Sequence, residues 1–102
     1  MPYLVQILLP VYDNEGERFP SAPYNEVRTK LADTFGGLTA YTRAPAEGVW
    51  ESGTALKRDD IVVVEVMVDP LDRAWWGSYK GDLERLFRQE QIVVRAQTYE
   101  PL

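Results

Sequence analysis

The sequence predicts an α+β sandwich in which two helices cover one face of a four-stranded antiparallel sheet. Three observations lead to this fold class. The chain has 102 residues, 45% of them hydrophobic, which suits one core and therefore a single domain over residues 1–102. Four segments have the composition or alternation of strands, and two have apolar residues at helical spacing. These segments follow one another in the order β-α-β-β-α-β.

The first two elements are a buried strand and an amphipathic helix. Residues 3–12 are mostly β-branched, aromatic or Leu, in a run too short to cross a membrane. Residues 13–17 form a polar turn, after which Ser21 and Pro23 can open a helix. Gly36 and Gly37 supply its stop. The apolar side chains that follow helical spacing in this segment are Tyr24, Val27, Leu31 and Phe35.

The middle of the chain predicts two further strands. Residues 38–44 alternate in a period of two, and Pro45 closes the segment. Residues 46–60 mix turn residues with Val, Trp and Leu, which favours a twisted hairpin extension over a structureless loop. Residues 61–68 are the clearest strand, because six of the eight are Val or Ile.

The last two elements complete the pattern. Asp69 is the expected N-cap of the second helix, with Pro70 as its first residue and Asp72 in its first turn. Residues 91–99 form the last strand. The resulting topology is ferredoxin-like, with strands in the spatial order 4-1-3-2. The buried stripe of the second helix is expected to comprise Trp76, Tyr79, Leu83, Leu86 and Phe87, with Trp75 at its edge.

Alternation along the strands divides the sheet into two faces. The four even-numbered valines of residues 61–68 share one face, which belongs under the helices. The opposite face carries Glu65 between the apolar residues Val63 and Met67. Gln6 and Leu8 lie on this face too, unless the register of the first strand is reversed.

The uncovered face supplies the candidate site. It mixes charged and aromatic groups with apolar residues that need cover, so we expect a homodimer that pairs sheet against sheet. This face is expected to bind a polar or anionic small molecule or to serve an interaction role. A purely structural ion-pair network is the alternative. Strand adjacency makes Glu65 with Arg43 the first expected pair. The candidate ligand-binding residues are Tyr41, Arg43, Trp50, Glu65, Arg95 and Tyr99.

Composition narrows the chemistry. The chain has no His and no Cys, which excludes an imidazole base, a thiolate nucleophile and His- or Cys-ligated metals, so we expect no metal and no cofactor. A net charge of −5 opposes nucleic acid as a partner. No apolar stretch is long enough to span a membrane, and a cytoplasmic location is expected. The polar groups left on the uncovered face are those of Arg, Glu, Tyr and Gln, which favour binding of a small molecule over catalysis.

Two enzymatic alternatives stay open. Met1-Pro2 precedes a strand, and removal of Met1 would expose a secondary amine, similar to the amino-terminal Pro of the tautomerase superfamily, with Arg43 or Arg95 assisting. The second alternative is an oxygenase of the dimeric α/β-barrel type, which would use the face that carries Arg43, Glu65 and Arg95.

Several short motifs resemble a family of small bacterial proteins known only as a domain of unknown function. They are Phe35-Gly36-Gly37-Leu38-Thr39, Gly48-Val49-Trp50, Ser78-Tyr79-Lys80 and Phe87-Arg88-Gln89-Glu90, in this order between residues 24 and 96. The resemblance implies the same βαββαβ fold and no specific activity.

Overall fold

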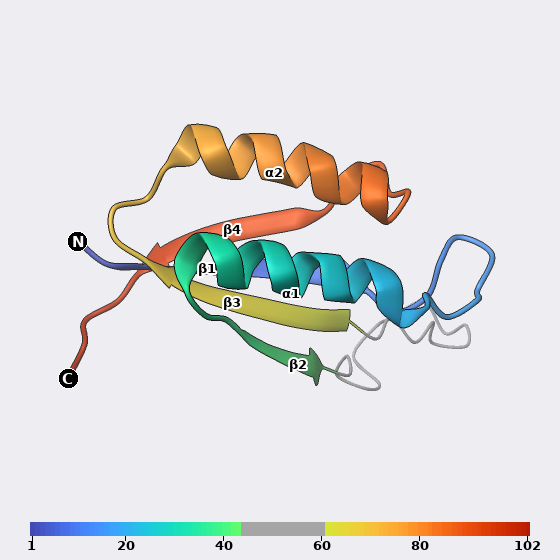
Figure 1. Cartoon of the computed structure of the whole chain (residues 1–102), viewed down its shortest axis with the longest axis horizontal. Helices are drawn as coiled ribbons and strands as arrows, with labels where there is room; N and C mark the ends of the chain where they lie inside the picture. Colours follow the sequence, from blue (N-terminus) through green and yellow to red (C-terminus); the bar gives the residue numbers. More distant parts are fainter. Residues whose placement is uncertain (44–60) are drawn as a thin grey trace, which may run out of the picture.

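A computed structural model describes residues 1–43 and 61–102 of the chain. Four strands form one antiparallel sheet, and both helices lie on the same side of it (Figure 1). The predicted α+β class and the βαββαβ order are confirmed. The elements are β1 (Tyr3–Pro10), α1 (Ser21–Phe35), β2 (Thr39–Arg43), β3 (Ile61–Val68), α2 (Arg73–Leu86) and β4 (Val93–Thr98).

The strands lie in the order β2-β3-β1-β4, which is the predicted order 4-1-3-2 read from the other edge. In β1 the odd-numbered residues Val5, Ile7 and Leu9 are buried beneath the helices. Gln6 and Leu8 therefore face away from the helices, which decides between the two registers that the sequence left open for the first strand. We call the side of the sheet away from both helices the open face.

The core lies between the sheet and the helices. The valines of β3 expected there pack into it, and Val64, Val66 and Val68 are buried. Each helix contributes side chains at helical spacing, because only that spacing keeps successive side chains turned to the sheet. The buried helix residues are Pro23, Val27 and Leu31 of α1 and Trp76, Tyr79 and Leu83 of α2, and Phe87 just beyond α2 is fully buried.

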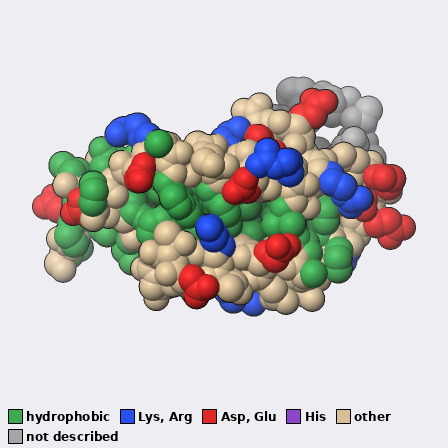
Figure 2. Space-filling model, turned by 45° about the horizontal axis from the view of Figure 1, so that its top comes forward, with side chains coloured by type: hydrophobic (Ala, Val, Ile, Leu, Met, Phe, Trp, Pro, Cys, Tyr) green, Lys and Arg blue, Asp and Glu red, His purple; other side chains and the backbone are tan. Residues whose placement is uncertain are grey.

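Aromatic contacts join the two helices at both ends. Near the end of α1, Phe35 stacks on Trp76 with ring centroids 5.3 Å apart. At the opposite end, Phe87 contacts Phe19 and Tyr24 at 5.2 and 5.3 Å. Between these clusters the helices leave a groove of about 480 Å³. Figure 2 shows hydrophobic side chains gathered across the middle of the helix-bearing side, with charged side chains around them.

The start of α2 differs from the prediction. Asp72, and not Asp69, is the N-cap, and its Oδ1 accepts the backbone N–H of Trp75 at 3.0 Å. This bond satisfies a donor that the first turn of a helix leaves without an intrahelical partner. Asp69 and Pro70 lie in the connection between β3 and α2, so the prediction that Pro70 begins the helix was wrong.

Three strands begin or end inside their predicted ranges. β2 begins at Thr39 and not at residue 38. β1 ends at Pro10, and the chain then forms a turn in which Asp13 Oδ1 accepts the backbone N–H groups of Glu15 and Glu17, both at 2.9 Å. β4 begins at Val93, because the backbone N–H of Ile92 bonds the Glu84 carboxylate instead. The Lys80 ammonium bonds the same carboxylate, and the two bonds lower the pKa of Glu84.

The predicted hairpin extension over residues 46–60 lies outside the described residues. Neither helix in the described ranges is long and apolar enough to cross a membrane.

Candidate functional site

A row of four polar side chains crosses the open face. Arg95 Nε donates to Gln6 Oε1 at 2.9 Å, and Gln6 Nε2 donates to Glu65 Oε2 at 2.7 Å. The Tyr41 hydroxyl reaches the same Glu65 oxygen at 3.3 Å. One residue comes from each strand, so the row runs across the whole sheet, a span of roughly 14 Å. We call Arg95, Gln6, Glu65 and Tyr41 the polar row.

Strand register explains why these side chains meet. Gln6 lies directly opposite Glu65 on β3 and directly opposite Arg95 on β4. Side chains at directly opposed positions of an antiparallel sheet project to the same face within contact distance. Tyr41 is opposite Val63, and its long side chain reaches Glu65 diagonally.

Gln6 separates two opposite charges. Its amide oxygen meets the Arg95 guanidinium and its amide N–H meets the Glu65 carboxylate, so each end of the amide faces the group that it complements. No salt bridge joins Arg95 to Glu65 among the described residues. Both charges therefore keep hydrogen-bonding capacity that a direct pair would consume.

The structure gathers three of the six predicted site residues in this row, namely Tyr41, Glu65 and Arg95. Tyr99 follows β4, and its backbone N–H donates to the Pro2 carbonyl. It is four residues from Arg95, roughly 13 Å along an extended chain. Trp50 and the side chain of Arg43 lie outside what the structure describes.

The expected pairing of Glu65 with Arg43 is not favoured by the register. Glu65 lies opposite Thr39, whereas Arg43 lies opposite Ile61, four residues away along β3. Adjacent strands were predicted correctly, but adjacency does not fix which residues face each other. Gln6 was placed on this face without being predicted as a site residue. Gln6 is the one polar residue inside the apolar run of β1, and this position could have indicated its place in the site.

Exposure on the open face is uneven. Met67 and Val93 are 66% and 45% exposed, as expected for apolar residues without cover. Val63 was expected to need the same cover, but it is only 2% exposed in the single chain. The apolar surface available to a partner on this face is therefore smaller than predicted.

Pro2 is not close to either arginine of the tautomerase alternative. It lies opposite Tyr99, four residues from the position opposite Arg95, and Arg43 is at the far end of the sheet, where Ile61 pairs with Pro10. The register therefore gives no support to an amino-terminal Pro assisted by Arg43 or Arg95.

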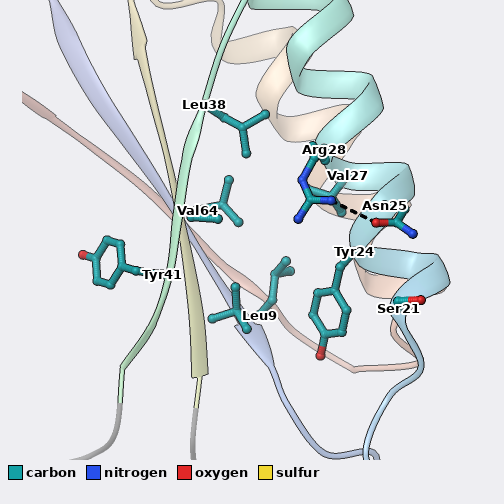
Figure 3. A pocket seen from close by; sticks show the side chains of 11 residues that line it. Leu9, Ser21, Tyr24, Asn25, Val27, Arg28, Leu38, Tyr41 and Val64 are labelled. Carbon is teal, nitrogen blue, oxygen red and sulfur yellow. Dashed lines mark hydrogen bonds between the residues drawn. The ribbon is translucent and has the colours of Figure 1, made fainter.

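A cavity of about 350 Å³ lies on the other side of the sheet, between α1 and the β2 edge. Its sheet side is apolar, with Leu9, Val62 and Val64, and its helix side carries Ser21, Asn25 and Arg28 (Figure 3). We call it the α1–β2 cavity. This cavity could not be predicted from the sequence, because its floor follows the predicted core pattern and Arg28 has the spacing of an ordinary exposed helix residue.

Two groups at this cavity are held by hydrogen bonds. Arg28 Nη1 donates to Asn25 Oδ1 at 3.0 Å, and the Tyr24 hydroxyl donates to the Pro10 carbonyl. Burial raises the pKa of Tyr24, an effect that the charge of Arg18 partly offsets. In residues 1–43 and 61–102 no acidic cluster is arranged to hold a metal ion.

No family model and no curated protein sequence matches this chain. The resemblance to the small bacterial family therefore stays a prediction. A solved structure described as a phage SAM lyase in complex with S-methyl-5'-thioadenosine is similar to it, with a TM-score of 0.61 over 94% of this chain and 80% of that chain. The two sequences are 13% identical. At this identity the likeness shows the fold, a ferredoxin-like α+β architecture.

Proposed function

We propose that this chain is a small-molecule-binding domain whose ligand contacts the polar row on the open face. The observation that carries the proposal is the hydrogen-bonded row itself, in which Gln6 holds Arg95 and Glu65 apart. A row built only for stability would gain little from keeping two opposite charges separated on a partly exposed surface.

The row suits a ligand that is polar or anionic. Arg95 uses Nε for Gln6, so its two Nη groups can bind a carboxylate, a phosphate or a ring acceptor. Glu65 can accept a further hydrogen bond from a ligand hydroxyl or amine. The similar solved structure is described as a complex with S-methyl-5'-thioadenosine, a polar small molecule, which supports this ligand class for the fold.

A second copy of the chain completes the proposed site. Met67 and Val93 flank the row and are exposed, so a partner that pairs open face against open face would cover them. Such a pairing is isologous, and it would enclose two polar rows in one interface. This proposal assigns binding and no reaction, with no nucleic acid and no membrane as partner and the cytoplasm as its location.

The dimer is tested by solution mass. We expect light scattering after gel filtration to give twice the chain mass at micromolar concentration. Met67→Glu should give a folded monomer, because each copy would place an unpaired carboxylate in the apolar part of the interface. Lys30→Glu on α1 is the matched control and should remain a dimer. A monomeric wild type over the whole concentration range would refute the pairing.

The ligand site is tested by calorimetric titration with S-methyl-5'-thioadenosine and with adenosine monophosphate as probes. We expect Arg95→Gln to weaken binding of the anionic probe about tenfold, the effect of one charge-assisted hydrogen bond. Lys30→Gln, which removes a positive charge from α1, should leave binding unchanged. Equal affinity of the wild type and of Arg95→Gln for both probes would exclude the polar row as the site.

A further inference from the structure

We propose that the α1–β2 cavity is a second binding site, which takes a small amphipathic monocarboxylate. Its apolar body would lie on the sheet side chains and its carboxylate would bind Arg28. The cavity is on the helix side of β2, whereas Figure 3 shows the Tyr41 ring of the polar row on the side of β2 away from α1. Tyr41 also belongs to the lining of the cavity, so the two proposed sites meet at β2, but the Tyr41 ring of the polar row does not point into the cavity.

The size and lining of the cavity fit such a ligand. Small-molecule sites generally enclose about 300–1,000 Å³ and combine an apolar lining with a few polar groups. This cavity has about 350 Å³, with Leu9, Leu38 and Val64 on the sheet side. That volume suits a body of one aromatic ring or a short alkyl chain.

The charge of Arg28 favours an anionic head group, such as a carboxylate, over a neutral or cationic one. Arg28 is the only charged residue in the described lining of the cavity, and no described carboxylate forms a salt bridge with it. This local positive charge stands out in a chain with a net charge of −5. An anion at this point gains attraction, and a cation would meet repulsion without compensation.

Arg28 is exposed, and one hydrogen bond orients its guanidinium. Its Nη1 donates to Asn25 Oδ1 at 3.0 Å, one turn earlier on α1. Figure 3 shows the guanidinium in the space between α1 and β2, level with Leu38 and Val64. The remaining guanidinium N–H groups can bind a carboxylate.

The test uses 4-phenylbutyrate as the probe and 4-phenyl-1-butanol as its uncharged counterpart, each titrated into the full chain labelled with ¹⁵N. We expect amide shifts in the first two turns of α1 and at Leu38–Ala40, and about tenfold tighter binding of the carboxylate than of the alcohol. Arg28→Gln should remove this preference. Lys30→Gln, a matched charge loss on the same helix, should leave it within about twofold, as should Arg95→Gln on the open face.

A second variant tests the cavity itself and does not depend on the fold of Arg28→Gln. Ala40 lines the cavity and is exposed, so Ala40→Leu should fill the space without disturbing the core, and it should abolish binding of both probes. The proposal is overturned if neither probe shifts these amides, or if Arg28→Gln keeps the preference for the carboxylate. Conversion of a dimer to a monomer by Ala40→Leu would assign the cavity to a second copy and would also overturn it.

Discussion

Tyr79 of α2 shows how the fold changes the ionisation of one residue. Burial raises the pKa of its hydroxyl to about 12, with smaller contributions from the carboxylates of Asp82 and Glu26, against 10.0 for an unperturbed tyrosine. The unfolded chain therefore releases this proton at lower pH than the folded chain. The contribution to stability is complete below pH 10 and is lost as the pH rises from 10 to about 12.

Tyr79→Phe tests this difference directly. It removes the ionisable hydroxyl while it keeps the buried ring, so its unfolding free energy should fall less than that of the wild type over the same pH range. At a pH of about 12, the wild type should have lost about 2 kcal/mol more unfolding free energy than the variant. Urea unfolding of both proteins at a series of alkaline pH values measures it, and parallel losses in the two proteins would contradict the assignment.

Individual contacts of the candidate site were only partly predictable from the sequence. Alternation placed Tyr41, Glu65 and Arg95 on one face, because side-chain direction in a strand depends only on position along it. The partner of Glu65 depends on register, and register depends on how turns and distant strands meet, which local patterns do not contain. For this reason the sequence indicated Arg43 where the structure has Gln6 and Tyr41.

At the scale of elements, α2 depends on its first turn. Asp72 accepts the Trp75 N–H, and no other side chain of residues 1–43 and 61–102 caps this end of α2. Asp72→Ala should lower the unfolding free energy by about 1 kcal/mol, whereas Asp72→Asn retains a cap and should cost far less. Thermal unfolding of the two variants measures the difference, and equal losses would show that the charge of Asp72, and not its hydrogen bond, stabilises the helix.

The positions of the elements were more predictable than their ends. Both helices and all four strands were expected, because hydrophobic periodicity reports which side of a segment is buried. The ends depend on single hydrogen bonds. Asp69-Pro70 and Asp72 both satisfy the composition of a helix start, and only the Trp75 contact decides between them. In the same way, β4 begins only at Val93, because the backbone N–H of Ile92 donates to the Glu84 carboxylate.

At the scale of the whole molecule, the topology follows from the order of the elements. A βαββαβ chain with short connections has few ways to bury two helix stripes on one sheet, and the order β2-β3-β1-β4 is one that keeps both crossovers on the same side. The groove between the helices and the α1–β2 cavity could not be predicted this way. They arise where side chains fail to fill space, which depends on packing and not on pattern.

The prediction of one domain over residues 1–102 is tested through Phe87, which is fully buried and contacts the Phe19 and Tyr24 rings at one end of the helix layer. Phe87→Ala should lower the unfolding free energy by about 3–5 kcal/mol, because it leaves a cavity in the only core joining both helices within the described residues. Lys30→Gln, at an exposed site on α1, should change it by less than about 0.5 kcal/mol. Since Phe87 is shared by distant segments, circular dichroism and tryptophan fluorescence should report a single coincident transition, shifted equally in both signals. Two separated transitions, of which Phe87→Ala moves only one, would mean that the chain unfolds in independent parts.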